Sequence, residues 1–224
     1  MLKVFRQKSY FLKLSKSRFL QKQIDFLGWI VEAGTIKPDP AKVQGLKEWP
    51  RELHSVAKVR STIGVIRYQR PFIPNFSAIA KPILKLTKKD QPFEWTEECT
   101  KALNTLIEII TNDPILRPPD LERQFHLDID ASNYVIGGIL YQLDDEGIRY
   151  DVGYYSKSLV AAERNYDIWD REYLALIRCL LHWRQFLVGS PHKVRVYTDH
   201  ANLQYWREPQ KIPDKIRRYI VTDV

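Results

Sequence analysis

The spacing of apolar residues changes partway along the chain, and this change limits the folds that the chain can adopt. Between residues 37 and 113, apolar side chains recur every three or four positions, which is the period of a helix packed on one face. After residue 122 they alternate with polar side chains, which is the period of a half-buried strand. Residues 114–121 contain three prolines and are interpreted as a linker. The sequence therefore predicts a helical unit followed by an α/β unit.

Capping residues mark the helices of the first unit. Asp39 followed by Pro40 predicts a helix start, with a capping carboxylate before a proline in the first turn. Ser55 is expected to cap a second helix, Ser77 to begin a short helix toward residue 86, and Thr96 to open a longer one. The apolar residues expected to face the core of this unit are Val59, Ile63, Ile66, Leu103, Leu106, Ile107 and Ile110.

The second unit is expected to contain a three-stranded meander, a helix and a further strand. The meander strands are predicted at residues 125–129, 136–143 and 148–155. A helix is predicted from residue 168 to residue 187, opened by Asp167 and closed before Gly189. Val194 and Val196 mark a fourth strand, which ends at Thr198-Asp199-His200 and completes the pattern. This order predicts a mixed sheet.

Basic residues are concentrated at the N-terminal end. The whole chain has a net charge of +8, and residues 1–60 contain 13 Lys and Arg against five Asp and Glu. Residues 1–22 contain seven basic residues and no acidic one, and a hairpin of strands is predicted from residue 24 to residue 36. We interpret the basic segment as a surface for a polyanionic partner, with a solvated basic face as the alternative.

Two features exclude other classes of protein. Cys99 and Cys179 lie 80 residues apart without metal-ligand spacing, so we expect reduced packing residues rather than a disulfide framework. No run of residues approaches the roughly 20 apolar positions of a membrane span, and the N-terminus lacks the apolar core of a secretory signal. We therefore expect an intracellular protein, in the cytoplasm or the nucleus, without a membrane partner.

Three carboxylates lie where the predicted sheet could bring them together. Asp130 and Asp199 each end a strand, off the parity of that strand's apolar residues. Glu172 lies on the edge of a helical apolar stripe, where a carboxylate is costly unless it meets a cation or hydrogen-bond donors. Hard oxygen ligands suit Mg²⁺ or Mn²⁺, and two such ions could activate water and stabilise the leaving oxygen of a phosphodiester.

The spacing alone leaves alternatives open. The three acids could be ordinary surface residues, with Glu172 paired with Arg171 or Arg178. Asp128 lies on the same strand face as Asp130 and is a rival ligand. His200 could be a ligand or a phosphate contact, although a lone histidine in a loop is more often neither.

Seven blocks of sequence resemble successive blocks of the reverse transcriptases of gypsy-class LTR retrotransposons. They are FLGWIV (26–31), IKPDPAKV (36–43), RPFIPNFS (70–77), FEWT (93–96), DAS (130–132), AERNY (162–166) and TDHANLQY (198–205). The blocks follow the family's order over essentially the whole chain. The resemblance implies an α/β fold in which a helical thumb subdomain precedes an RNase H-like mixed sheet with flanking helices. Residues 1–36 would be the tail of the palm with its primer-grip hairpin, residues 37–113 the thumb, and residues 122–224 the RNase H-like domain.

The resemblance also implies a site. In that family, ribonuclease H uses acids that match Asp130, Glu172 and Asp199, and the motif selects Asp130 over Asp128 because the ligand precedes Ala-Ser. These acids would hold two Mg²⁺ or Mn²⁺ ions and cleave the RNA strand of an RNA–DNA hybrid. Further residues expected to contact nucleic acid are Arg60, Arg67, Arg70, Ser132 and His200. Capping, or pairing with Glu52, is the alternative for the arginines.

The chain also departs from the family. The polymerase's paired catalytic aspartates precede the matched blocks, so copying of nucleic acid is not expected. The family continues beyond a helix containing Arg217, Arg218 and Tyr219 with a last strand and a helix that carries a fourth acid, and both are missing here. Pro71 stands where the family usually has Arg, and Trp29 stands where it often has His. Little cleavage is therefore expected from this chain, a catalytically inert nucleic-acid-binding remnant is the alternative, and a fuller reverse transcriptase chain is a candidate partner.

Overall fold

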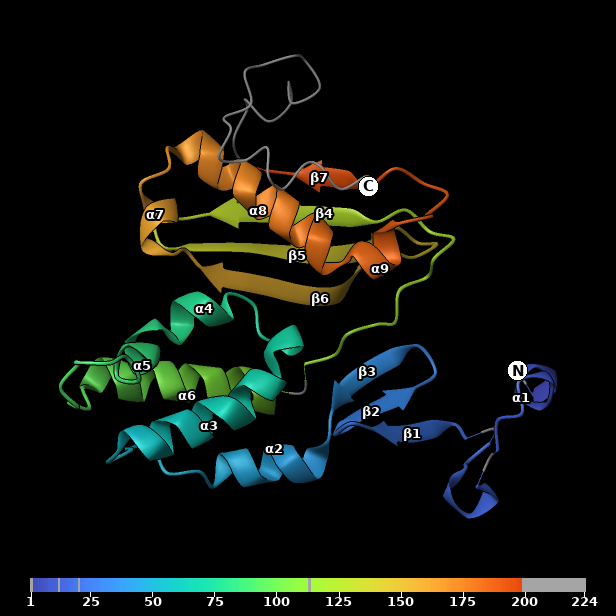
Figure 1. The fold of residues 1–224 in the computed structure, drawn as a ribbon, viewed down its shortest axis with the longest axis horizontal. Helices are drawn as coiled ribbons and strands as arrows, with labels where there is room; N and C mark the ends of the chain where they lie inside the picture. Colours follow the sequence, from blue (N-terminus) through green and yellow to red (C-terminus); the bar gives the residue numbers. More distant parts are fainter. Residues whose placement is uncertain (1, 12, 20, 113, 199–224) are drawn as a thin grey trace.

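The computed structural model describes residues 2–11, 13–19, 21–112 and 114–198. Figure 1 shows a helical unit with a small sheet beside it, and above them a four-stranded sheet with a long helix across one face. Asp199, His200 and the helix expected around residues 217–219 lie outside the described residues. Among the described residues, no helix has the length and apolar character that crossing a membrane would require.

The N-terminal segment forms two short helical turns and a three-stranded antiparallel sheet. In chain order these are α1 (Leu2–Gln7), the 3-10 helix η1 (Leu14–Lys16), β1 (Gln23–Phe26), β2 (Trp29–Glu32) and β3 (Thr35–Pro38). Leu27 and Gly28 have φ angles of 51° and 77°, as a tight turn between two antiparallel strands requires. The expected hairpin is therefore present, and a third strand extends it.

The helical unit begins directly after this sheet. It contains α2 (Pro40–Lys47), α3 (Val56–Tyr68), η2 (Arg70–Phe72), α4 (Phe76–Ile79), α5 (Lys81–Lys85) and α6 (Glu97–Thr111). The Asp39 carboxylate accepts a hydrogen bond from the Ala41 amide at 2.9 Å, and the Ser55 hydroxyl accepts one from the Lys58 amide at 3.2 Å. Both predicted caps are confirmed.

One prediction in this unit is wrong. The short helix expected from Ser77 toward Leu86 is two helices, α4 and α5, with a break at Ala80. Pro82 lies in the first turn of α5, where it has no amide hydrogen to donate, and its ring would collide with a preceding helical turn. The proline therefore starts a new helix instead of continuing the old one.

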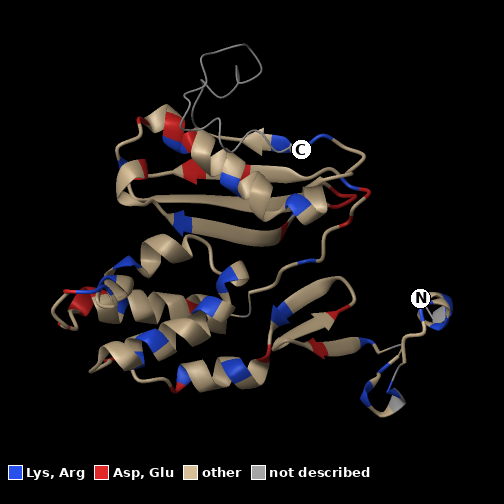
Figure 2. Ribbon diagram, viewed as in Figure 1, with Lys and Arg blue, Asp and Glu red and all other residues tan. Residues whose placement is uncertain are grey.

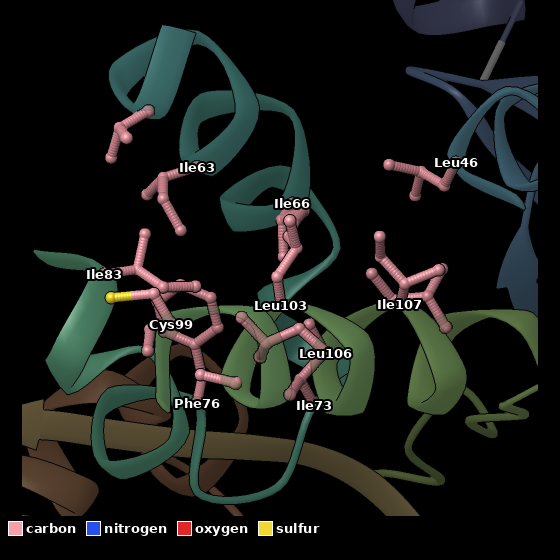
Figure 3. Packing of buried hydrophobic residues seen from close by; sticks show 14 of the residues in the cluster. Leu46, Ile63, Ile66, Ile73, Phe76, Ile83, Cys99, Leu103, Leu106 and Ile107 are labelled. Atoms are coloured by element: carbon pink, nitrogen blue, oxygen red, sulfur yellow. The ribbon is translucent and has the colours of Figure 1, made fainter. Parts of the chain in front are cut away.

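The core of the helical unit lies between α3, α5 and α6. Figure 3 shows Leu103 and Leu106 of α6 among side chains of α3 and the α4–α5 segment, with Ile107 directed toward Leu46 of α2. All seven residues predicted to face this core are buried; they are Val59, Ile63, Ile66, Leu103, Leu106, Ile107 and Ile110. The apolar residues that recur at helical spacing in the sequence are therefore the residues that the fold buries.

The second unit is a mixed sheet in the order β6-β5-β4-β7. Its strands are β4 (His126–Ala131), β5 (Val135–Leu143), β6 (Arg149–Ser158) and β7 (Arg195–Tyr197). The first three form an antiparallel meander, and β7 runs parallel to β4. The predicted α/β fold with a mixed sheet is confirmed.

The helices of this unit are α7 (Ala161–Arg164), α8 (Ile168–His182) and α9 (Arg184–Leu187). The helix predicted over residues 168–187 is therefore interrupted, because the chain turns at Trp183, whose side chain is buried in the core of the sheet unit. That core lies between α8 and the odd-numbered residues of β4, which are Leu127 and Ile129, together with Phe125 just before the strand. Cys99 and Cys179 are both free and buried, in separate cores.

Buried serines join the two units. The Ser77 amide at the start of α4 donates to the Ser156 hydroxyl of β6 at 3.0 Å, and the two hydroxyls lie 3.2 Å apart. Residues 114–121 contact both sheets, because Leu116 pairs with Ile36 of β3 and the Arg117 amide donates to the Asp151 carbonyl of β6 at 3.0 Å. The helical unit is thereby fixed against the outer strand of the second sheet.

The junction gives a first prediction. Replacement Ser156→Ala leaves the buried Ser77 amide without its acceptor, so we expect a loss of about 1–3 kcal/mol in the free energy of unfolding. Ser158→Ala, two positions along the same strand and exposed, is the matched control and is expected to change stability by less than about 0.5 kcal/mol. Urea titration followed by tryptophan fluorescence measures both. Equal effects of the two substitutions would contradict the assigned role of Ser156.

Candidate active site

The candidate site lies at one end of the mixed sheet. Because β4 and β7 are parallel and adjacent, their carboxyl ends lie at the same edge. The first half of α8 crosses this edge, and Figure 2 shows acidic residues on β4 and on α8 there. Edges of this kind commonly carry sites in α/β proteins, because strand ends and helix starts converge on them.

Asp130 is presented outward by the pleat of β4. The odd-numbered residues of the strand are buried against α8, so the even-numbered ones project from the opposite face. Asp130 is exposed, as its parity predicted. It lines a small cavity of about 140 Å³ together with Asp128, Gly137 of β5 and Asn75 from the helical unit.

Glu172 is buried on the other side of the strand end, with only 2% of its surface exposed. Its Oε1 atom accepts a hydrogen bond from the Ala131 amide at 3.2 Å, and its Oε2 atom accepts one from the Thr198 hydroxyl at 3.4 Å. One carboxylate therefore contacts the residue after Asp130 and the residue before Asp199. These donors offset part of the free-energy cost of burying the charge. The position of Glu172 on the apolar stripe of the helix had predicted that such donors, or a cation, would be needed.

The arginines that could have paired with Glu172 have other partners. Arg178 contacts Glu163 through two nitrogens, at 2.5 and 3.3 Å, and Arg171 donates to the side chain of Asn133. Burial alone would raise the pKa of Glu163, but hydrogen bonds from Arg178 and from the Val160 amide hold that pKa below its ordinary value. Glu163 is thus the carboxylate that binds Arg178.

Asp128 and Asp130 have different surroundings. The Asp128 carboxylate forms an ion pair of 2.8 Å with Arg149, which also contacts Asp151 at 2.9 Å and lies over the Tyr141 ring at 3.8 Å. Within the described part of the chain, Asp130 has no such ion pair. The Arg149 contact neutralises Asp128 and favours Asp130 as the residue available to a cation.

The geometry for a metal is incomplete within the described residues. No three His, Cys, Asp or Glu side chains among them are grouped so that they could hold a metal ion. Asp199, the third predicted ligand, lies outside that set, as does His200. The described residues thus supply two carboxylates, Asp130 and Glu172, at the edge of the sheet where Thr198 follows β7. Carboxylate oxygens are the donors that Mg²⁺ and Mn²⁺ prefer, so this donor set fits such an ion.

The structure separates the three arginines predicted to contact nucleic acid. Arg67 is exposed on α3, and Arg60 donates to the Thr87 carbonyl at 3.3 Å. Arg70 lies at the junction of the two units, where it donates to the Ser77 hydroxyl at 3.2 Å. Burial, and to a lesser extent the nearby Arg67, lower the pKa of the Arg70 guanidinium. Two of these arginines therefore have structural contacts, and neither contact is to Glu52.

Ser132 holds the turn between β4 and β5. Its hydroxyl donates to the Val135 carbonyl at 2.9 Å and accepts from the Tyr134 and Val135 amides at 3.3 and 3.0 Å. Asn75, which the sequence did not single out, reaches the same edge with a left-handed φ of 53°. In the sequence Asn75 appeared only within the block at residues 70–77, next to Pro74, and neither signal predicts a site.

Comparisons with known proteins agree with this geometry. Residues 95–196 match the family described as the RNase H-like domain found in reverse transcriptase. The chain also aligns with Tf2 transposon polyproteins of Schizosaccharomyces pombe, Tf2-3 and Tf2-4 among them, at 31% identity over 202 residues. The alignment covers 90% of this chain and 15% of the polyprotein. The chain therefore spans about 15% of the length of the curated relatives that it matches.

Two solved structures of the foamy viral protease-reverse transcriptase share the fold. The one in complex with dsDNA has a TM-score of 0.73 at 20% identity and is covered over 48% of its length by 99% of this chain. The one in complex with an RNA/DNA hybrid has a TM-score of 0.71 at 21% identity, with 97% of this chain covering 30% of that one. The resemblance found in the sequence is thus confirmed: the chain is related to the gypsy-class LTR-retrotransposon polyproteins, and residues 95–196 carry the RNase H-like domain of reverse transcriptases.

Proposed function

We propose that the chain binds RNA–DNA hybrid and that Asp130 and Glu172 belong to a divalent-metal site that cleaves the RNA strand. The observation that carries this proposal is the buried Glu172 carboxylate, which contacts both strand ends that bear the matching acids. The RNase H-like family match and the titles of the foamy viral complexes, with dsDNA and with RNA/DNA hybrid, support a nucleic-acid substrate.

In this proposal each carboxylate has its own task. Asp130 is exposed, so it can meet a cation that arrives with the phosphodiester. Glu172 is held by the Ala131 amide and the Thr198 hydroxyl, which fix the direction of its oxygens before a cation binds. Asp199 would be the third ligand, on the residue after Thr198. A bound Mg²⁺ or Mn²⁺ supplies an activated water and stabilises the leaving oxygen.

We further propose that the three stretches of the chain correspond to parts of a reverse transcriptase. Residues 1–36 would be the tail of the palm, residues 37–113 the thumb and residues 122–224 the RNase H-like domain. The basic N-terminal segment would follow the phosphate backbone without reading its sequence. We assign no polymerase chemistry to these residues.

Metal binding tests the choice of Asp130 over its neighbour. Asp130→Asn removes a proposed ligand charge, so we expect at least about a tenfold weaker affinity for Mn²⁺ in calorimetric titration. Asp128→Asn is the matched control, because it removes an equal charge from the same strand face but from a residue paired with Arg149; its affinity should stay within about twofold. The reverse order of the two effects would show that Asp128 is the ligand.

Cleavage tests the role of Glu172. Glu172→Gln keeps the shape of the side chain and an acceptor for the Ala131 amide but removes the charge, so we expect cleavage of the RNA strand to slow by at least about a hundredfold. The assay follows a labelled hybrid with Mg²⁺ or Mn²⁺, and Glu146→Gln in the exposed β5–β6 turn is the control. A cleavage rate of the Glu172→Gln variant equal to that of the unaltered chain would contradict the assigned role of Glu172.

The basic N-terminal segment can be removed without disturbing the first sheet, because β1 begins at Gln23. Deletion of residues 1–21 is expected to weaken hybrid binding and to reduce the slope of log affinity against log salt by at least about 2. Replacing Lys3, Arg6 and Lys8 with Gln should weaken hybrid binding and reduce the salt slope in part, because the positive charges of the segment, and not its length, attract the phosphates. An unchanged slope in fluorescence anisotropy would identify the segment as a solvated basic face.

A further inference from the structure

The cavity beside Asp130 is formed by both structural units. Its volume is about 140 Å³, and Pro74 and Asn75 of the helical unit line it together with residues of β4, β5 and β6. Asp130 projects into it from the face of the sheet opposite α8. Figure 1 shows α4 beside β6, and Asn75 directly precedes α4. A residue from outside the sheet unit therefore lies at the proposed metal site.

Gly137 lets the Asn75 side chain approach the strand that carries Asp130. In the antiparallel ladder, Gly137 of β5 is the direct partner of Asp130 of β4. The Asn75 Oδ1 atom lies 3.6 Å from the position that a β-carbon on Gly137 would occupy. The β-carbons of directly paired residues lie about 4.5–5.5 Å apart on the same face of a sheet. The amide oxygen of Asn75 therefore takes the place of a cross-strand side chain next to Asp130.

The fold does not use the side chain of Asn75. Asn75 is the N-cap residue of α4, a position where Asn commonly accepts a hydrogen bond from a helix amide, yet its side chain makes no such bond. In the described part of the chain, neither the Asn75 side chain nor the Asp130 carboxylate has a hydrogen-bond partner, and both residues are exposed. Both groups are therefore available to a ligand in the cavity.

The charges around the cavity favour a cation over an anion. Asp128 and Asp151 share one cation, Arg149, at 2.8 and 2.9 Å, so these three residues keep one negative charge in excess. Asp130 adds a second negative charge. A carboxylate and a neutral amide oxygen are both hard oxygen donors, which suit Mg²⁺ or Mn²⁺. Since a water molecule takes about 30 Å³ in the liquid, the cavity also has room for several waters around such a cation.

We propose that Asn75 is an auxiliary ligand of the cation held at Asp130, and that its amide oxygen acts through a water molecule in the hydration shell of that cation. Mg²⁺ usually keeps several waters in proteins, so a neutral oxygen near the carboxylate can bind one of them. The buried hydrogen bond between Ser77 and Ser156, two residues along the chain, holds Asn75 in this place. The inference rests on the proposed function for the metal at Asp130, and it adds that the metal site is incomplete without the helical unit.

Two substitutions change the side chain of Asn75 and keep its backbone. Asn75 has a left-handed φ of 53°, a conformation that Gly adopts readily and Asp tolerates. Asn75→Gly removes the amide oxygen, so the affinity of the full chain for Mn²⁺ in calorimetric titration should fall about three- to tenfold. Asn75→Asp replaces the neutral oxygen with a charged one, so the affinity should rise about threefold or more. Because the two expected effects have opposite signs, a loss of folding cannot produce both.

Matched controls separate these effects from changes in backbone and charge. Asp90 has a left-handed φ of 60° and is exposed outside the cavity, so Asp90→Gly repeats the backbone change elsewhere. Asn104→Asp adds the same charge as Asn75→Asp, at an exposed position of α6. Both controls should leave the affinity for Mn²⁺ within about twofold, because salt screens exposed charges that lie far from the site. Controls that match the Asn75 variants in size and sign would overturn the proposal.

A double-mutant cycle separates a failure of this proposal from a failure of the metal site. In the Asp130→Asn background, Asn75→Gly should change the affinity by less than about 1.5-fold, because both residues act on the same cation. An equal loss with and without Asp130 would show that Asn75 acts through the fold, and weaker binding by Asn75→Asp would also overturn the proposal. If Asp130→Asn weakens binding but neither Asn75 variant alters it, only the assignment of Asn75 is wrong. If Asp130→Asn leaves Mn²⁺ binding unchanged, the metal site is wrong and the assignment of Asn75 falls with it.

Discussion

The site depends on one buried carboxylate. Glu172 is buried on the inner side of α8, where a charge without hydrogen-bond donors would destabilise the fold. Hydrogen bonds from the Ala131 amide at the end of β4 and from the Thr198 hydroxyl after β7 compensate this charge. β4 and β7 are neighbours because they pair in the sheet, and the two contacts hold the helix against their ends. The contacts that make the buried charge of Glu172 tolerable thus also connect α8 to the end of β4 and to the residue after β7.

The second constraint is the fixed position of the helical unit. The buried hydrogen bond between Ser77 and Ser156 holds α4 against β6, and α5 follows directly, which brings Lys81 to the Tyr134 ring. Asn75 reaches the cavity beside Asp130 through the same junction. Neither unit would form this surface by itself, because Asn75 and Lys81 come from the helical unit whereas Asp130 and Tyr134 come from the sheet unit.

Sequence periodicity predicted whatever depends on local spacing. The parity of β4 predicted that Asp130 points outward, and the helical stripe predicted the buried face of α6 and the unusual burial of Glu172. It did not predict the break at Trp183 or the division of α4 from α5, where tertiary packing and a proline override the apolar pattern. The resemblance selected Asp130 over Asp128, and the fold adds a physical reason that the sequence did not contain, because Arg149 reaches Asp128 only across the sheet.

The central claim is that Asp130 and Glu172 belong to one divalent-metal site. The most direct test is anomalous diffraction from crystals of the chain grown with Mn²⁺ and a hybrid duplex. We predict a peak within about 2–2.5 Å of a carboxylate oxygen of both residues, the distance range of hard-cation coordination. Two results would contradict the account. The first is an anomalous peak coordinated by Asp128, with Arg149 displaced. The second is a crystal in which the hybrid duplex is well ordered but no anomalous peak lies at this edge of the sheet.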